Sequence, residues 1–134
     1  MTYLKNACLL AGRLLMGAYF ILPGVQKITG FDETTSYMEA HSVPMVSVLL
    51  PLTILVQLSA GAAIIVGYRG KFAAFILAGL TFIISIYMHD FWSMAKGMEQ
   101  AHELQNFIKN IAIMSGLLIV AAQGTGKFSL DNKR

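Results

Sequence analysis

The stretch Leu104–Val120, LQNFIKNIAIMSGLLIV, combines two kinds of sequence in one predicted helix. From Ile111 onward it has the apolar character of a helix embedded in lipid. Its first turns carry Asn106, Lys109 and Asn110, whose spacing of i, i+3 and i+4 places them on one helix face. The sequence therefore predicts a spanning helix that turns two amides and an ammonium group towards other helices where it enters the membrane.

The composition of the whole chain fits an integral membrane protein. Of its 134 residues, 56% are apolar and 13% are charged, whereas soluble domains have about 25% charged residues. The single cysteine, Cys8, excludes an intramolecular disulfide and a CxxC pair, and with them the membrane redox enzymes that relay electrons through cysteines. We predict one all-α transmembrane domain over residues 1–134.

Four apolar runs are long enough to cross a bilayer, which takes about 20 residues. They cover approximately residues 7–28, 45–67, 72–92 and 105–123, and none shows the two-residue alternation of a strand. These four predicted spans form a four-helix transmembrane bundle. Residues 31–41 are expected to form a short interfacial helix capped by Asp32, residues 68–71 a tight turn, and residues 93–104 an outward extension of the fourth span.

The charges on the loops predict the orientation of the bundle. If the N-terminus is cytoplasmic, the inner segments hold Lys5, Arg69, Lys71, Lys127, Lys133 and Arg134, and the outer segments hold Lys27, Lys96 and Lys109 with six of the seven acidic residues. The positive-inside rule therefore predicts that both termini lie in the cytoplasm.

Glycines and polar residues at helical spacing indicate which face of each span looks inward, because small residues let helices approach closely in lipid. The predicted inward residues are Arg13, Gly17, Phe20, Gly24 and Lys27 in the first span; Gln57 and Gly61, with Ser59, Ala63 and Gly67 on a neighbouring face, in the second; Phe75, Gly79, Phe82, Ile86 and His89 in the third; and Asn106, Asn110, Ile113, Leu117 and Val120 in the fourth.

Several of these polar side chains are expected at one level, near the outer boundary of the membrane. We therefore hypothesise an outward-facing ligand pocket formed by Lys27, Gln57, His89, Asn106, Lys109 and Asn110, with Gln57 nearer mid-membrane. The alternative for the two lysines is snorkelling to lipid phosphates. For His89, the alternatives are a proton-handling pair with Asp90 and a simple capping role.

Two further sets of residues have both a functional and a structural interpretation. Arg13 is a costly intramembrane charge, and its structural interpretation is snorkelling or a hydrogen bond to a neighbouring helix. Glu99 and His102, at i and i+3, could form a metal site with neighbouring acids and histidines, but such pairs are common on solvated helices, and we assign no metal.

An ordered set of short motifs resembles the DoxX family of small four-helix bacterial membrane proteins. The motifs are GRLLMG at 12–17, PGVQK at 23–27, QLSAG at 57–61, VGYR at 66–69, HDFW at 89–92, NFIKN at 106–110 and GTGKFSLD at 124–131. The resemblance implies a multi-pass protein of the bacterial inner membrane, loosely associated with redox systems such as thiosulfate–quinone oxidoreduction and with oxidative-stress enzymes. Family members often have glutamate where Gln57 stands, so a proton-transfer role is not carried over.

The leading functional hypothesis is a membrane component of a redox pathway that binds a quinone or another lipid headgroup. No cofactor is evident in the chain itself, so a bound quinone or lipid and a redox protein partner would be needed. The alternatives are a non-catalytic scaffold that recruits partners and, ranked last, a small-solute transporter that would have to form a homo-oligomer. The expected partners include the lipid bilayer. No nucleic-acid partner is expected.

Overall fold

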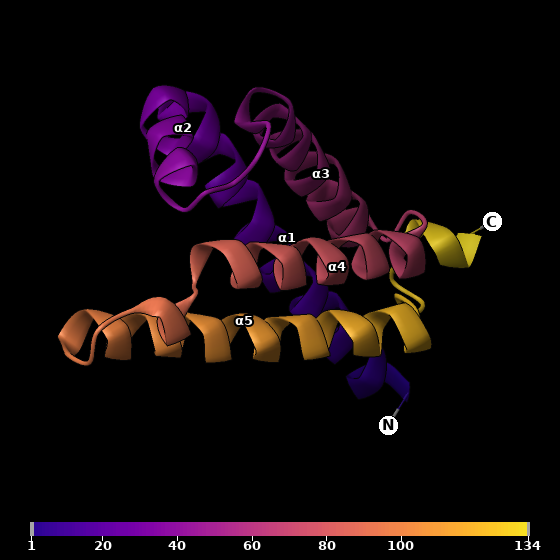
Figure 1. The fold of residues 1–134 in the computed structure, drawn as a ribbon. Helices are drawn as coiled ribbons and strands as arrows, with labels where there is room; N and C mark the ends of the chain where they lie inside the picture. Colours follow the sequence, from indigo (N-terminus) through magenta and orange to yellow (C-terminus); the bar gives the residue numbers. More distant parts are fainter. Residues whose placement is uncertain (1, 134) are drawn as a thin grey trace.

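The computed structural model describes the backbone of residues 2–133 and the side chains as far as Asn132. The described part is all-helical (Figure 1). The elements are α1 (Thr2–Thr29), α2 (Phe31–Ala40), α3 (Val46–Val66), α4 (Gly70–Met88), the 3-10 turn η1 (Phe91–Ser93), α5 (Met98–Gln123) and the 3-10 turn η2 (Leu130–Lys133). Four helices, α1, α3, α4 and α5, are long and apolar enough to cross a membrane. The prediction of four spans is confirmed.

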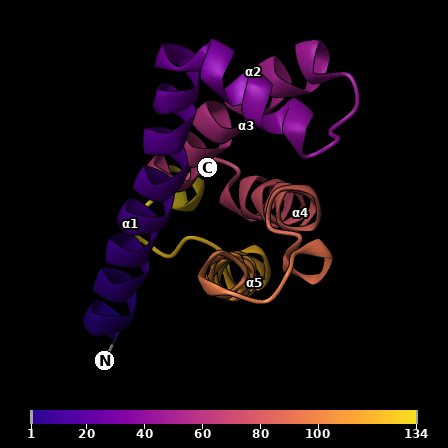
Figure 2. The same cartoon turned by 60° about the vertical axis from the view of Figure 1, so that its left-hand side comes forward.

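The four long helices pack as two pairs, α1 with α3 and α4 with α5, and the pairs are joined mainly through α3 and α4. From the α3–α4 turn, α3 leads away from α4, and Figure 2 views α4 and α5 end-on beside α1. Both termini and the α3–α4 turn lie at one end, which we call the tail end. The opposite end, with α2 and the α4–α5 connection, is called the loop end.

Small residues set the spacing at the centre of the bundle. The main buried cluster consists of Phe20, Ala60, Ile64, Ala73, Ala74, Leu77, Ala78 and Leu117, and a second cluster beside α2 consists of Val46, Leu50 and Ile54. Four alanines in the first cluster let the backbones of α3, α4 and α5 come close, which compensates for the absence of a hydrophobic driving force between helices in lipid.

The inward faces predicted for three of the four spans are confirmed, except that Ser59 and Lys109 are exposed. In α1 the buried residues include Arg13, Gly17, Phe20 and Gly24. In α3 they include Gln57 and Gly61, and in α5 they are Asn110 and Leu117.

The inward face predicted for the third span is wrong. Phe75 and Phe82 are 62% and 47% exposed, and Gly79 is exposed as well. The buried face of α4 instead carries Ala73, Ala74, Leu77, Ala78, Thr81 and Ser85. The two hydroxyls are satisfied within the helix, Thr81 by Leu77 O at 2.8 Å and Ser85 by Thr81 O at 2.8 Å. Phenylalanine side chains can face lipid without a free-energy cost. Close packing between helices therefore determines the rotation of α4, and it places the small alanines at the interface.

The short helix expected at residues 31–41 is confirmed as α2, but its predicted cap is wrong. The N-cap residue is Gly30, and Asp32 makes no capping hydrogen bond. Gly30 N still donates to Gln26 O at 2.9 Å, while Thr34 N donates to Gly30 O at 2.9 Å. The backbone hydrogen bonds of α1 therefore continue into α2 through Gly30, which leaves no position for a side-chain cap. Asp32 lies in the first turn of α2, where a negative charge is favourable.

The tight turn is confirmed, and the helical extension predicted for residues 93–104 is confirmed from Met98 onward but not for residues 93–97. Helix α5 begins at Met98, about two turns before the apolar run. The α3–α4 connection is short because Gly67 adopts a left-handed conformation (φ 72°), and Tyr68 N bonds back to Ala63 O at 2.9 Å.

Gly17 provides a test of the closest approach between α1 and α3. A Cβ placed there would lie 2.7 Å from Gly61 O, a backbone atom that cannot move without shifting α3. We expect Gly17→Ala to lower the free energy of unfolding by about 1–3 kcal/mol, the usual cost of overpacking. Unfolding in mixed micelles measures the effect, and Gly12→Ala is the matched control because a Cβ there meets nothing within 4 Å. Equal stability of the two variants would contradict the prediction.

Candidate ligand-binding site

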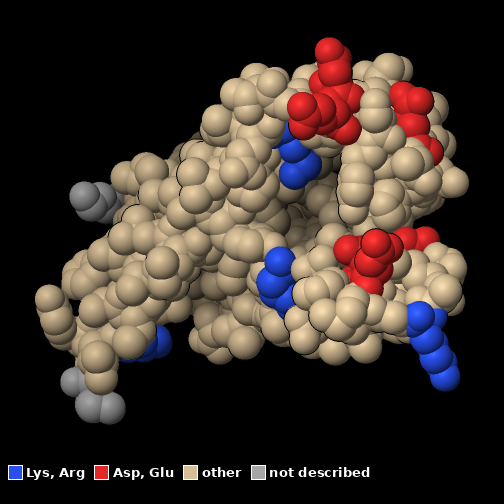
Figure 3. All heavy atoms as spheres, turned by 90° about the vertical axis from the view of Figure 1, so that its left-hand side faces the viewer, with Lys and Arg blue, Asp and Glu red and all other residues tan. Residues whose placement is uncertain are grey.

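A pocket of about 340 Å³, with several polar residues in its lining, lies at the loop end, where α1, α2, α3 and α4 meet. We call it the head pocket, and its lining residues are Pro23, Gln26, Lys27, Thr34, Tyr37, Met38, Thr53, Ile84, Met88 and His89. Figure 3 views the loop end directly and shows it hollowed between two lobes, with Lys or Arg atoms at the edge of the hollow. Lys27 is half-buried in the last turn of α1, on the inward stripe that begins at Arg13.

A carboxylate on α5 holds His89 in place. His89 Nδ1 lies 3.0 Å from Glu103 Oε2, and both side chains are mostly buried. Asn106 Nδ2 donates to the other oxygen, Glu103 Oε1, at 3.2 Å. With Nδ1 engaged, Nε2 is the ring nitrogen that remains for a ligand. Sequence reasoning missed this role of Glu103, although its position three residues before Asn106 puts it on the same face of α5.

Helix α2 borders the pocket through Tyr37, whose ring packs against that of His41, the residue after the helix. The two rings lie 4.6 Å apart, and His41 Nδ1 lies 3.5 Å from Asp90 Oδ1. Burial, together with the negative charges of Glu103 and Asp90, raises the pKa of Tyr37. Its hydroxyl therefore stays protonated and can donate a hydrogen bond. Of the alternatives considered for His89, the structure pairs Asp90 with His41 and pairs His89 with Glu103.

The other candidate residues lie outside the head pocket. Gln57 is 4% exposed, and its Oε1 has no hydrogen-bond partner among the described residues. Asn110 is buried, and its Oδ1 accepts a hydrogen bond from Tyr19 Oη at 3.4 Å, which links α5 to α1. Lys109 is exposed and does not line the pocket. The structure therefore places Lys27 and His89 in the same pocket and links Asn106 to His89 through Glu103.

Arg13 lies in the half of α1 nearer the tail end and is 2% exposed. Its guanidinium donates to four carbonyls: Ile64 O at 2.9 Å, Ile65 O at 2.7 Å, Thr125 O at 2.8 Å and Phe128 O at 3.0 Å. The first two belong to the last turn of α3, whose carbonyls have no partner within the helix. The other two belong to the chain after α5. Arg13 thereby fastens three segments together.

An apolar groove of about 420 Å³ continues from the head pocket between α3 and α4, and we call it the tail groove. The two cavities share Met38, Thr53, Ile84 and Met88. The rest of the groove is lined by Val43, Pro44, Leu49, Leu52, Val56, Phe75, Ile76, Gly79, Leu80, Ile83 and Tyr87. Around Gly79 the space is open, since a Cβ there would meet nothing within 4 Å. The divergence of α3 from α4 creates this groove.

The acidic and histidine side chains at the loop end are paired with each other or dispersed. Within residues 2–133, no group of three or more His, Cys, Asp or Glu side chains is placed to hold a metal ion. The chemistry offered by the head pocket is therefore that of hydrogen-bond donors, from Lys27, Tyr37 and His89, beside an apolar groove.

Comparison with known proteins places the chain in a family. The family model described as DoxX matches residues 8–90. The chain is 36% identical to the inner membrane protein YqjF of Escherichia coli K12 over 98% of this chain and 95% of that protein. It is 29% identical to the inner membrane protein YphA of the same organism over 96% and 91%. It is also 26% identical to the Surfeit locus protein 4 homolog of Drosophila melanogaster, over 97% of this chain but 42% of that protein.

No solved structure matches the chain. The family match, the two inner membrane relatives and the four apolar helices together identify a multi-pass inner membrane protein. The chain belongs to the DoxX family.

Proposed function

We propose that the protein is a membrane component of a redox pathway that binds an isoprenoid quinone, or a lipid with a similar carbonyl headgroup, at its loop end. The observation that supports this proposal is the continuity of two cavities of different chemistry, the head pocket with its donors and the tail groove without charge. Both volumes fall in the usual range of small-molecule sites, about 300–1,000 Å³. The redox context rests on the family resemblance.

The donors of the head pocket suit a carbonyl or anionic acceptor. Lys27 makes no ion pair with a described residue, because both ion pairs in residues 2–133 join a histidine to an acid. Its ammonium group would donate to a headgroup oxygen. Tyr37 of α2 and His89, which follows the last residue of α4, line the same small pocket and would offer the Tyr37 hydroxyl and His89 Nε2 as further donors. Three donors from three helices would fix the orientation of a planar ring that has two oxygens.

The tail groove suits a flexible apolar chain. Its lining consists of aliphatic and aromatic side chains apart from Thr53 and Tyr87, and Leu52, Phe75 and Ile83 at its edges are exposed on the surface that faces lipid. A lipid-soluble ligand could therefore enter sideways from the bilayer, place its headgroup beside Lys27 and leave its tail against α3 and α4.

Replacement of Lys27 tests the headgroup contact. We expect the gently purified full chain to carry a quinone or lipid detectable by mass spectrometry, and to bind a short-tailed benzoquinone on titration. A hydrogen bond from a charged donor contributes about 1.5–3 kcal/mol. Lys27→Met should therefore weaken binding at least about tenfold.

Lys96→Met is the matched control, because it removes the same charge from an exposed position of the α4–α5 connection. Failure to detect any bound molecule, together with no binding by the unmodified protein, would overturn the proposal. The scaffold interpretation would then be favoured, and a stoichiometric protein partner should co-purify from cells.

A further inference from the structure

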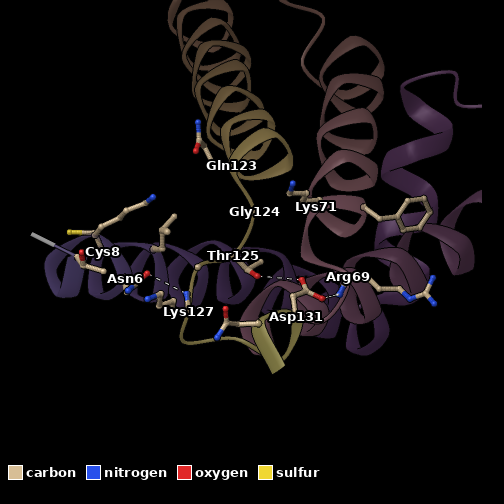
Figure 4. Close-up of a pocket in the computed structure, with 15 residues that line it drawn as sticks. Asn6, Cys8, Arg69, Lys71, Gln123, Gly124, Thr125, Lys127 and Asp131 are labelled. Atoms are coloured by element: carbon tan, nitrogen blue, oxygen red, sulfur yellow. Dashed lines mark hydrogen bonds between the residues drawn. The ribbon is translucent and has the colours of Figure 1, made fainter. Parts of the chain in front are cut away.

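A second and larger hollow, of about 1230 Å³, lies at the tail end, remote from the head pocket. We call it the tail-end pocket. It is formed by the first turns of α1, the α3–α4 turn with the start of α4, the last residue of α5 and the chain that follows α5 (Figure 4). Its polar lining includes Lys5, Asn6, Lys71, Gln123, Lys127 and Asp131.

Three lysines from three separate segments border this pocket. Lys5 comes from α1, Lys71 from α4 and Lys127 from the chain after α5. None of them forms an ion pair with another described residue, because the ion pairs within residues 2–133 are both at the loop end. All three lysines are exposed, and their like charges would attract an anion to this pocket.

The backbone places two of these lysines. Asn6 is buried, and its Oδ1 accepts a hydrogen bond from Lys127 N at 3.3 Å, which holds the chain after α5 against α1 (Figure 4). Lys71 extends towards Gly124 in the same view, and a Cβ at Gly124 would lie 3.1 Å from Lys71 Cε. Gly124 has φ of +90°, so the turn that leaves α5 both requires glycine and leaves room for the lysine.

The carboxylate that lines the pocket is already engaged with the protein. Asp131 Oδ1 accepts from Arg69 N at 2.7 Å, and Oδ2 accepts from Gly70 N at 2.9 Å and from Thr125 Oγ1 at 3.3 Å. Asp131 thereby caps the first turn of α4, where the amide groups lack helical partners. The nearby Arg69 guanidinium lies over the Tyr68 ring, 5.8 Å from its centroid. Asp131 therefore serves the fold, and its single negative charge is outnumbered by the three lysines that line the same pocket.

The apolar part of the lining is continuous with the surface that faces lipid. Leu9 and Phe72 border the pocket, and Phe72 is 67% exposed. Exposed leucines of α1, among them Leu14 and Leu15, follow in the direction of the membrane centre. The pocket therefore presents ammonium groups at the level where a bilayer carries its phosphates, above a face that acyl chains can cover.

We propose that the tail-end pocket binds a phosphate group between Lys5, Lys71 and Lys127, and that the bilayer supplies it as the headgroup of an anionic phospholipid. Free inorganic phosphate would offer the same chemistry without the acyl chains. The site is independent of the head pocket, and binding there would hold α1, α4 and the chain after α5 together from outside.

Native mass spectrometry of the delipidated full chain tests this inference. The protein is titrated with phosphatidylglycerol, phosphatidylcholine and inorganic phosphate. We expect phosphatidylglycerol to bind more tightly than phosphatidylcholine. A lysine near a membrane surface contributes about 1 kcal/mol of attraction to anionic lipid. The variant Lys71→Gln/Lys127→Gln should therefore lose roughly 30-fold of the affinity for phosphatidylglycerol and little of that for phosphatidylcholine.

The control variant is Lys96→Gln/Lys109→Gln, which removes two exposed lysines from the opposite end. Equal loss in both variants would show a general charge effect and overturn the site. Equal affinity of the unmodified protein for the two lipids, without phosphate binding, would also overturn it. Saturable binding of inorganic phosphate that depends on Lys71 and Lys127 but is not displaced by phosphatidylglycerol would assign the pocket to a free phosphate and overturn the lipid source.

Discussion

Arg13→Met is expected to lower the free energy of unfolding by on the order of 3–5 kcal/mol, a large effect for a single substitution. The substitution removes four hydrogen bonds at once, at distances of 2.7–3.0 Å. It removes the charged donor from two terminal carbonyls of α3, of which Ile64 O keeps Gly67 N at 3.2 Å, and from two carbonyls of the chain after α5. Hydrogen bonds from charged donors are among the strongest. Equilibrium unfolding in mixed micelles measures the loss.

The local consequence separates this role from a general effect of charge. Without Arg13, residues 124–133 should exchange amide hydrogen faster and become sensitive to protease before the bundle unfolds. Lys109→Met, which removes an exposed charge from α5, should change neither property. Arg13→Lys should recover only part of the stability, because one ammonium group cannot reach four carbonyls that a planar guanidinium spans. The prediction would be contradicted if Arg13→Met were as stable as the unmodified protein and its residues 124–133 remained protected from exchange and protease.

The inward face of α1 was predictable because a charged residue, Arg13, and two glycines, Gly17 and Gly24, recur on it at helical spacing. A surface that faces lipid would not carry these residues, and all three are buried. What Arg13 binds was not predictable. Its partners are backbone carbonyls more than 50 positions away, and carbonyl groups leave no mark in the sequence.

The rotation of α4 shows the limit of pattern reasoning for a membrane helix. Gly79, at helical spacing from His89, suggested an inward face shared with Phe75 and Phe82. In a water-soluble protein, an orientation of α4 that exposes two phenylalanines could have been ruled out. In a membrane protein it could not, because phenylalanine can face lipid. The discriminating signal was the run of alanines at 73, 74 and 78, which is as periodic as the phenylalanine stripe and better suited to close packing.

The candidate site was predicted in part. Lys27 and His89 end their helices at the same level, and the structure places both in the head pocket. Tyr37 was not anticipated there because it belongs to α2, whose position depends on the fold of the whole loop end. Lys109 directly precedes the buried Asn110, and adjacent residues of a helix point in different directions. Its side chain is therefore exposed although it is close to the face of Asn106 and Asn110. Its participation stays a prediction of the sequence.

The same misjudged face of α4 leads to the second large effect. Gly79 is not at the helix interface but in the tail groove, where a new side chain would meet no protein atom close to its Cβ. A bulky residue can therefore fill the groove without disturbing the core of the bundle. Gly12 on α1 is equally open but lies outside the groove, so it offers a matched position for the same substitution.

Gly79→Trp is expected to weaken the binding of a quinone with an isoprenoid tail by about 100-fold, close to 3 kcal/mol, the upper end of the usual cost of overpacking. A tailless benzoquinone should bind the variant as it binds the unmodified protein, because the head pocket keeps Lys27 and its other donors. Lys27→Met should have the converse pattern and weaken both ligands. Titration of the two quinones against Gly79→Trp, Gly12→Trp and Lys27→Met distinguishes these outcomes. If Gly79→Trp bound the tailed quinone normally, the groove would not hold the tail. If it lost both ligands equally, the substitution would have altered the head pocket, and the division of the site into head and tail would be wrong.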